Sequence, residues 1–366
     1  MGLFWNIFLF LSSVCFALFL GEAVIRWVLP QELGNWTYTR DGLTLHLSNF
    51  TQYSNKFGHN ITTNSEGMRD REHSASKASG VFRILLLGDS FMEANQVKLE
   101  DAFSTLLADQ LTQSARRPIE VINASVSGWG TDDQLTYLVR HGYRFSPDLV
   151  LVGVTLHNDV QDNQRQRFHS YVDGRLQEKR VNQLPATDFV ILQVKEILAS
   201  HSHLYQVLLK VKSTSWVRNE QEKLNSHVLG LLEKKQNSSI QQGWGLTRLL
   251  FREMKKMSAE MGAPVVVFLI PLRLQVSEQS LRSFLEAHDI VSDQIVLDRP
   301  QRDMTQIGSD EGIEVIDLLA EFRRSEKNSP DQLYLAVDGH WTAAGHRLAS
   351  EIVANRLLSS GTLPQN

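Results

Sequence analysis

A short apolar run, Ile84–Leu87, ends directly at Gly88-Asp89-Ser90, and this junction restricts the fold more than any other stretch of the chain. A run of this length that is apolar at every position is typical of a strand buried on both faces of a parallel sheet. Glycine allows a sharp turn, so the serine would stand at the carboxyl end of the strand, where open α/β sheets bind ligands. Ser90 is therefore a candidate nucleophile if a base reaches it, although a plain strand-to-helix cap would use the same three residues.

Further strand patterns alternate with amphipathic helical patterns along the chain. This alternation predicts an α/β fold with a central parallel sheet of about five strands and helices on both faces. The other predicted strands are Ile119–Asn123, Leu149–Val154, Val265–Ile270 and Ile313–Ile316. The predicted helices are Asp101–Gln113, Asp132–His141, Leu246–Met261 and Ala343–Leu358.

Two long stretches interrupt this alternation. Residues 31–80 are polar and show no sustained period, which predicts a connector that adds edge structure at most. Residues 160–243 are charged and mostly helical in pattern, and they are too long for a simple connection between strands, so we expect an inserted helical cap. The predicted organisation is an anchor over 1–30, a connector over 31–80 and an α/β domain over 81–360 that contains the insertion.

The N-terminal segment Leu3–Leu20 has eighteen residues without a charge. At 1.5 Å per residue this length roughly crosses a hydrocarbon core of ~30 Å. A cleaved signal peptide is the alternative, but no Lys or Arg precedes the run and no small-residue cleavage site follows it. We expect an uncleaved transmembrane helix in which Glu22 and Arg26, four residues apart, pair near the interface. The flanking charges do not decide the topology.

Composition excludes some classes of function. A hydrophobic fraction of 42% with 21% charged residues is that of a globular protein with a full core. The net charge of -4, without a long basic run, gives no support to nucleic-acid binding. The one cysteine, Cys15, lies inside the apolar span, so the rest of the chain has neither a disulfide nor a cysteine metal site. His201 and His203 would point to different faces of a helix, and we expect no metal and no cofactor.

Four polar segments fall at predicted strand ends or before the last helix: Gly88-Asp89-Ser90, Ser127–Gly130, His157–Asp159 and Asp338–Trp341. In this order they resemble the named blocks of the SGNH (GDSL-type) hydrolase family, which supply a serine, a glycine, an asparagine and a histidine. The resemblance covers roughly residues 82–358 and implies the three-layer fold of that family, with a helical insertion and, here, an N-terminal transmembrane helix.

The resemblance implies a role for each block. Ser90 would be the nucleophile, His340 the base, and Asp338 the residue that holds the imidazole. The backbone N–H groups of Ser90 and Gly128 and the side-chain amide of Asn158 would form the oxyanion hole. The residue types suit this chemistry, because a serine hydroxyl needs a base near neutral pH and a tetrahedral intermediate needs neutral donors at its negative charge.

The last block departs from the commonest family pattern, Asp-x-x-His. Here Asp338 and His340 are two apart and Trp341 follows, a form that resembles the polysaccharide O-acetyltransferase branch related to alginate-acetylating enzymes. Membrane-anchored SGNH proteins of unknown substrate share this form. The spacing leaves the role of Asp338 open, and His346 is a competing base that we place inside the closing helix.

Several neighbouring residues have two readings. His157 orients Asn158 or lines the site, and Asp89 more often fixes the turn through backbone amides than acts chemically. We expect Asp159 and Asp162 to cap the first helix of the insertion or to face solvent. Trp129 and Trp341 form a sugar-stacking platform or pack the rim of the site.

Three functions remain open at this stage. The first is an SGNH esterase or O-acyltransferase that acts on O-acyl groups, most readily O-acetyl, of an envelope or extracellular glycan. The second is a lipolytic esterase or lysophospholipase, and the third is a catalytically silent binding or assembly protein. The resemblance implies a bacterial inner-membrane protein whose catalytic domain is extracytoplasmic, with an acylated carbohydrate or lipid ester as substrate. The sequence does not identify protein partners.

Overall fold

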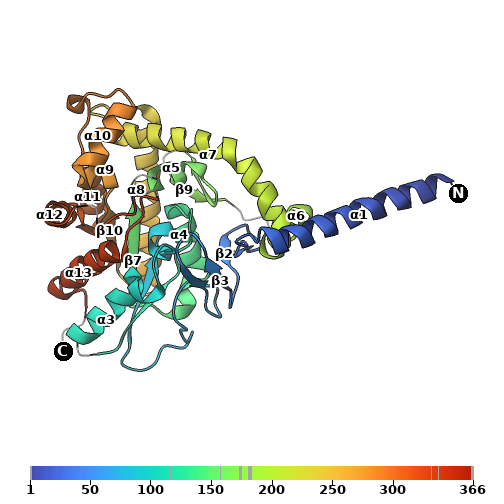
Figure 1. Ribbon diagram of the computed structural model, residues 1–366. Helices are drawn as coiled ribbons and strands as arrows, with labels where there is room; N and C mark the ends of the chain where they lie inside the picture. The colour runs from blue at the N-terminus through green and yellow to red at the C-terminus, as the bar shows by residue number, and fades with distance from the viewer. Residues whose placement is uncertain are drawn as a thin grey trace.

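The central element of the fold is a single parallel sheet (Figure 1). The computed structural model describes residues 2–115, 117–156, 158–172, 175–179, 184–330, 332–336 and 338–363, and of residues 212–226 the backbone alone. Within them the sheet has the order β11-β10-β7-β5-β6, and every neighbouring pair is parallel. Its strands are β5 (Phe82–Leu87), β6 (Ile119–Asn123), β7 (Leu149–Thr155), β10 (Val265–Ile270) and β11 (Glu314–Asp317). The predicted α/β fold with about five parallel strands is confirmed.

Helices cover both faces of the sheet and so form three layers. Side chains alternate along each strand: Leu85 and Leu87 pack into one hydrophobic cluster, whereas Ile84 and Leu86 pack into the other. The first face is covered by α4 (Thr131–Arg140), α8 (Ser238–Glu260) and α11 (Arg299–Glu311). The second is covered by α3 (Phe103–Ala115), α12 (Leu319–Asn328) and α13 (Ala343–Ser359).

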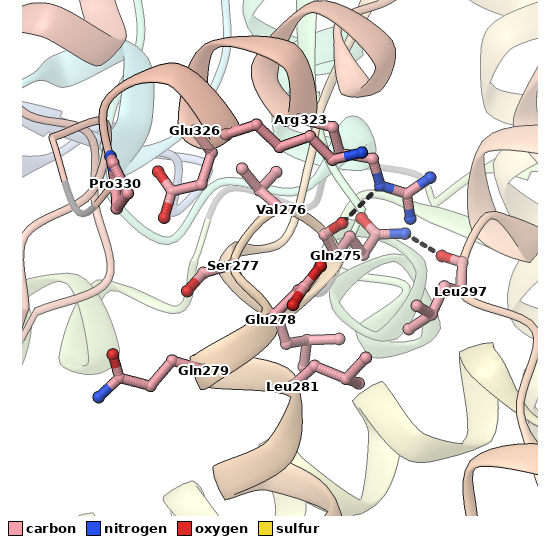
Figure 2. A pocket seen from close by; sticks show the side chains of 12 residues that line it. Gln275, Val276, Ser277, Glu278, Gln279, Leu281, Leu297, Arg323, Glu326 and Pro330 are labelled. Carbon is pink, nitrogen blue, oxygen red and sulfur yellow. Dashed lines mark hydrogen bonds between the residues drawn. The ribbon is translucent and has the colours of Figure 1, made fainter.

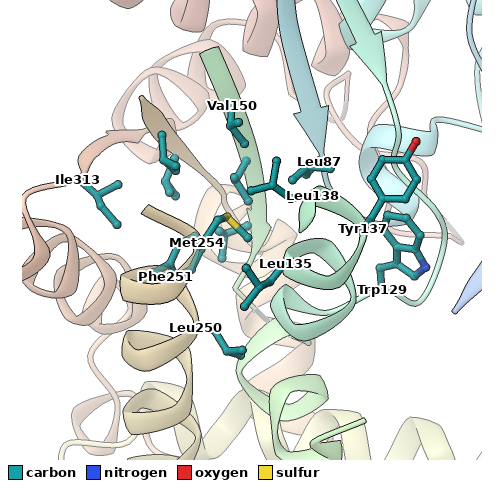
Figure 3. Close-up of a cluster of buried hydrophobic side chains, with 14 of the residues drawn as sticks. Leu87, Trp129, Leu135, Tyr137, Leu138, Val150, Leu250, Phe251, Met254 and Ile313 are labelled. Atoms are coloured by element: carbon teal, nitrogen blue, oxygen red, sulfur yellow. The ribbon is translucent and has the colours of Figure 1, made fainter. Parts of the chain in front are cut away.

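The first cluster shows why these sequences form these layers. Figure 3 shows Leu135 and Leu138 of α4 and Met254 of α8 directed toward the strands that carry Leu87 and Val150. All five of these side chains are fully buried. The stretches Ile84–Leu87 of β5 and Leu149–Val152 of β7 are apolar at every position, because they face a helical layer on both sides.

The connector contains more structure than the sequence predicted. It forms two antiparallel hairpins outside the central sheet, one of β1 (Trp36–Tyr38) with β2 (Thr44–His46), the other of β3 (Thr51–Ser54) with β4 (His59–Thr62). Strands of three or four residues are too short to produce a clear alternating pattern, which explains why sequence reasoning missed them.

The segment between β7 and β10 is mainly helical, as predicted, but it includes a hairpin of β8 (His169–Val172) with β9 (Arg175–Glu178). Its helices are α5 (Asp159–Asp162), α6 (Ala186–His201) and α7 (His203–Leu232), and α8 begins at Ser238, earlier than the predicted residue 246. Short helices complete the described chain: α2 (Ser90–Glu93), α9 (Arg273–Val276), α10 (Glu278–Ala287) and 3-10 turns at Leu99–Asp101, Gly142–Phe145, Asn163–Arg165 and Ser292–Gln294.

The N-terminal helix α1 (Gly2–Val28) projects away from the rest of the protein (Figure 1). It is long and apolar enough to cross a membrane, and none of it is buried. The predicted pair of Glu22 and Arg26 is present, with 3.0 Å between Oε1 and Nη2. The division of the chain into anchor, connector and α/β domain stays a prediction.

Candidate active site

Ser90 lies at a tight turn between β5 and α2. A Cβ on Gly88 would stand 2.5 Å from Cγ of Met92, so only glycine fits between the strand and the helix that follows. Asp89 caps α2, because its Oδ1 accepts a hydrogen bond of 3.0 Å from the backbone N–H of Phe91. The turn-fixing role predicted for Asp89 is therefore seen, and Ser90 becomes the first helical residue, half-buried after the end of β5.

The structure brings three of the predicted site residues into one hydrogen-bonded chain. The Oγ of Ser90 lies 2.8 Å from Nε2 of His340. The other ring nitrogen of His340, Nδ1, is hydrogen-bonded to Oδ1 of Asp338. A two-residue spacing thus lets the carboxylate reach the imidazole, since Gly339 between them has a φ of 78° and turns the chain back.

Asp338 also accepts a second hydrogen bond, which the sequence did not predict. Lys56, from the turn between β3 and β4, places its Nζ 2.5 Å from Oδ2 of Asp338. The hydrogen bond with His340 holds the pKa of the Asp338 carboxyl far below its ordinary value, and the one with Lys56 adds to this, against the opposing effect of burial. Asp338 is therefore ionised across the working pH range, and His340 Nδ1 carries the proton of their hydrogen bond.

The candidate oxyanion donors follow the three adjacent strands β6, β5 and β7. Gly128 has a φ of 80°, a left-handed conformation that favours glycine. No acceptor for its N–H is present in the described part of the chain. The side chain of Asn158 donates from Nδ2 to Oδ2 of Asp89 at 3.2 Å, so the serine turn itself orients this amide.

A buried glutamate connects the serine turn to the Gly128 loop. Glu93, at the end of α2, accepts a hydrogen bond of 2.5 Å from the backbone N–H of Ser127 through Oε2. In addition, the ring of Phe91 lies 4.6 Å from that of His340, centroid to centroid. The sequence did not indicate that Lys56, Glu93 and Phe91 belong to the site. The only signal was the position of Glu93 and Phe91, which lie within four residues of Ser90.

The structure corrects two of the expectations about neighbouring residues. Trp129 and Trp341 are buried, with exposed fractions of 1% and 0%, so they belong to the core and offer no platform for a sugar. Asp159 and Asp162 are also buried and do not face solvent. Asp159 does not cap a helix either: its Oδ2 accepts from the backbone N–H of Thr155 at 2.7 Å, and burial raises its pKa well above the ordinary value.

The other histidines that the structure describes take no part in this hydrogen-bonded chain. His346 lies inside α13, as expected, where it is buried with its ring edge-on to Trp341. His157 lies outside the described residues. His203 accepts from the backbone N–H of Gln31 through Nδ1, at 2.7 Å, while His201 ends α6. Among the described residues, no group of three or more His, Cys, Asp or Glu side chains is arranged to hold a metal.

Two cavities lie near α9 and α10. One, of about 590 Å³, is next to the triad, since it is lined by Phe91 and Gly339 as well as by the segment after β10. Its walls are mostly apolar, with Arg273, Gln279 and two serines as polar groups. The other cavity is larger, at about 740 Å³, but no residue from the four polar segments that form the candidate site lines it. Figure 2 shows that in the larger cavity Arg323 donates to the backbone carbonyl of Gln275, and Gln275 donates to that of Leu297, so these polar groups are engaged within the protein. We therefore assign the smaller cavity to the site.

Comparison with known proteins supports the resemblance found in the sequence. The family model described as "SGNH hydrolase-like domain, acetyltransferase AlgX" matches residues 231–366, which include the Asp338–Trp341 block but not Ser90, Gly128 or Asn158. This match and the three-layer sheet confirm that the chain resembles the SGNH hydrolases and has their type of fold. No curated protein matches the sequence.

Solved structures with a similar arrangement are distant. A variant of Axe2, an acetyl-xylooligosaccharide esterase from Geobacillus stearothermophilus, is 14% identical over 78% of this chain and 96% of its own, with a TM-score of 0.43. A lipase/acylhydrolase from Enterococcus faecalis is 13% identical over 76% of this chain and 96% of its own, with a TM-score of 0.38. Likenesses at this level carry no conclusion about function.

Proposed function

We propose, from the premise that this chain resembles the SGNH hydrolases, that it is a serine-dependent ester hydrolase or O-acyltransferase. The observation that carries the proposal is the hydrogen-bonded chain from Ser90 Oγ through His340 to Asp338. A serine at the end of a central strand, with its hydroxyl 2.8 Å from an imidazole that a carboxylate orients, has the parts that nucleophilic catalysis requires.

The geometry supports the following sequence of steps. Ser90 Oγ attacks the acyl carbonyl carbon while its proton passes to Nε2 of His340, and Asp338 stabilises the imidazolium that forms. When the tetrahedral intermediate collapses, His340 returns the proton to the departing alcohol oxygen and an acyl-serine remains. Water or a sugar hydroxyl then gives its proton to His340 as it attacks the acyl-serine. When this second intermediate collapses, His340 passes the proton to the departing Oγ of Ser90, and an acid or a new ester is released.

The proposed oxyanion hole consists of the backbone N–H groups of Ser90 and Gly128 and the amide of Asn158. These donors follow three neighbouring parallel strands, whose carboxyl ends meet at one edge of the sheet. The hydrogen bond from Asn158 to Asp89 uses one of two amide protons, which leaves the second for the substrate oxygen. Donors that are held in place before the reaction lose little energy to reorganisation during it.

We further propose that the substrate is an O-acetyl ester on an envelope or extracellular glycan. The Asp-x-His-Trp form and the family match, whose description names an acetyltransferase, support this choice. The contacts of Glu22 and Arg26 with the start of α7 and the end of α6 support retention of α1 as a membrane anchor, because cleavage after α1 would remove them. The proposed location is the bacterial inner membrane, with the catalytic domain outside the cytoplasm.

The apolar cavity beside Phe91 favours one competing function, a lipolytic esterase, because apolar walls suit an acyl chain. Chain-length preference separates the two. Full-length protein in detergent is given p-nitrophenyl acetate, butyrate and octanoate, beside its Ser90→Ala variant. Serine-dependent turnover that favours acetate supports the acetyl-ester function, and a preference for octanoate supports the lipolytic one.

The same assay addresses the third possibility, a silent assembly protein. If no ester is turned over in a Ser90-dependent way, acylation of Ser90 is tested directly by mass spectrometry after incubation with each ester. Acyl-serine that accumulates without hydrolysis identifies a strict transferase. Absence of acylation from all three esters contradicts the proposed function.

A further inference from the structure

The exposed face of α6 is apolar. Val190, Ile191, Val194, Ile197 and Leu198 are between 39% and 59% exposed, and we call these five residues the α6 apolar face. Their spacing places them on one side of a helix. Exposure of five adjacent apolar side chains to water is unfavourable in free energy and uncommon on soluble proteins. This face therefore indicates a non-aqueous neighbour.

The opposite side of α6 packs inward and is mixed in character, because the polar Glu196 and Ser200 lie there beside the half-buried Phe189, Leu192 and Ala199. Glu196 accepts a hydrogen bond of 2.8 Å from Oγ1 of Thr37 in β1, and Gln193 donates to the same Glu196 carboxylate at 3.2 Å. Ser200 is buried, and its Oγ donates to the carbonyl of Glu196 at 2.7 Å. A helix on the surface of a soluble domain has its apolar side inward and polar residues outward, whereas α6 carries apolar residues on its outward side as well. The outward apolar residues of α6 therefore favour an apolar neighbour on that side as well.

The junction between α6 and α7 is bound to the end of α1. Glu22 accepts hydrogen bonds from the backbone N–H groups of His203 and Leu204, at 3.0 and 2.9 Å. Arg26 donates to the carbonyl of His201 at 2.7 Å. The Glu22 carboxylate at the first turn of α7 and the Arg26 guanidinium at the last turn of α6 satisfy backbone groups that helix ends leave unpaired. These hydrogen bonds fix the junction beside the C-terminal end of α1, where Figure 1 shows α6.

The length of α1 sets the depth of this junction. Its 27 residues extend for about 40 Å, longer than the ~30 Å hydrocarbon core of a bilayer. Glu22 and Arg26 are the only charged residues in α1 and lie near its C-terminal end, where charges reach the headgroups. The α6–α7 junction is fixed to these two residues, so it stands at the boundary between headgroups and acyl chains.

We propose that the α6 apolar face inserts into the interfacial region of the same bilayer that α1 crosses. The proposal rests on the anchoring role of α1 proposed above. The exposed Leu208, Leu209 and Val211 extend apolar character onto α7, while Lys195 on α6 has a stem long enough to reach lipid phosphates. Interfacial helices bind in this way, with the apolar side in the acyl boundary and the charges in the headgroups. The catalytic domain is then held by two contacts and has a fixed orientation on the membrane.

Collision accessibility of spin labels tests this directly. Full-length protein is reconstituted at one copy per lipid nanodisc, with labels at native Cys15, at Val194→Cys and at Val291→Cys, the last two in a Cys15→Ser background. Val291 is a matched control, because it is an exposed valine far along the chain from α6, 60% exposed against 49% for Val194. Oxygen concentrates in the acyl region and a nickel chelate stays in water. Ile197→Cys serves as a second probe of the same face.

The expected result is that labels at 194 and 197 gain oxygen collisions and lose nickel collisions relative to 291. If the label at 194 collides with the nickel chelate as often as the label at 291, while the label at Cys15 is shielded from it, the proposal is overturned and the membrane anchor is retained. A Cys15 label open to nickel overturns the anchor and this proposal together. If a label at 194 is open to nickel at one copy per nanodisc and becomes shielded when the measurement is repeated at two copies, a second chain is the occupant and the proposal is overturned. None of these readouts requires catalytic activity.

Discussion

The ammonium group of Lys56 lies 2.5 Å from Oδ2 of Asp338, while Oδ1 of the same carboxylate holds the imidazole of His340. The two residues are 282 positions apart in the sequence. A hairpin of the connector thus reaches the back of the candidate triad, and each oxygen of Asp338 has its own partner. With both oxygens engaged, the carboxylate is restrained from rotating away from His340.

This relationship predicts a modest role for Lys56 in catalysis. Lys56→Met should lower kcat by up to about fivefold, because exposed ion pairs contribute up to ~1 kcal/mol and 1.36 kcal/mol corresponds to tenfold in rate. Lys56→Arg should restore most of the rate, and KM should not change. Steady-state kinetics on the preferred ester measures this; an unchanged kcat in Lys56→Met would show that Asp338 keeps its position without the lysine.

The hydrogen bond between Asp338 and His340 predicts a large effect of Asp338→Asn despite the unusual spacing. An asparagine neither stabilises the imidazolium nor selects its tautomer, and in other serine triads this change costs about 10⁴ in kcat. His340→Ala should abolish turnover. Circular dichroism shows whether each variant is folded, and near-normal rates in a folded His340→Ala protein would contradict the assignment of the base.

Loss of an oxyanion donor should slow the chemical step without weakening substrate binding. Asn158→Ala should cost ~2–4 kcal/mol of transition-state stabilisation, seen in kcat with KM nearly constant. Asn158→Asp is the sharper comparison, because it keeps the size of the side chain but replaces a donor with an acceptor. Equal activity of Asn158→Asp and the wild type would exclude Asn158 from the oxyanion hole.

Burial of the two tryptophans predicts an effect on stability and none on sugar binding. Trp341→Ala should lower the free energy of unfolding by roughly 3–5 kcal/mol, the usual cost of deleting a large buried aromatic side chain. Trp129→Phe, which keeps an aromatic ring in the core, should leave KM for an acetylated oligosaccharide unchanged. A KM increase without loss of stability would return Trp129 to the substrate site.

Burial lowers the pKa of His346 from 6.5 to about 3, with a smaller contribution from the nearby charge of Arg69. Between these pH values the unfolded chain binds a proton at this residue that the folded chain does not bind. The free energy of unfolding should therefore fall as the pH is lowered through this window, by up to about 1.4 kcal/mol per pH unit from His346.

Replacement of His346 by Asn removes this titration. Urea unfolding of the detergent-solubilised protein at pH 6.5, 5.5 and 4.5 should give a shallower pH dependence for His346→Asn than for the wild type. The comparison of slopes holds even if the variant is less stable at every pH. Parallel slopes would mean that His346 is hydrated or charged in the folded protein.

Local sequence was sufficient for the elements that lie deepest in the protein. The strands Ile119–Asn123 and Val265–Ile270 were predicted with the bounds that the structure has. Val265–Ile270 is packed on both faces and is apolar at every position, and both strands are followed by turn residues. The same applies to Gly88 and Asp89, whose turn depends on neighbours in the chain.

Only those site residues that belong to short recognisable sequence segments could be predicted. Ser90, Asn158 and His340 stand in segments with a recognisable order, although nothing in that order states that His340 reaches Ser90 within 2.8 Å. The sequence likewise left two roles open for Trp129 and Trp341, stacking on sugars or packing at the rim of the site, because a tryptophan beside a polar block looks the same in a sequence whether it is buried or exposed. Burial is a property of the packed chain.

What the sequence alone determined is therefore the α/β class, the apolar N-terminal span and the residues whose chemistry suits an acyl transfer. Only the tertiary structure decided which groups interact. Lys56 donates to Asp338, Glu93 accepts from the backbone of Ser127 beside Gly128, and Glu22 accepts from the backbone at the start of α7. The physical reason is range. Strand and turn patterns arise from neighbours a few residues apart, whereas these ion pairs and hydrogen bonds join segments brought together only by burial of a common core.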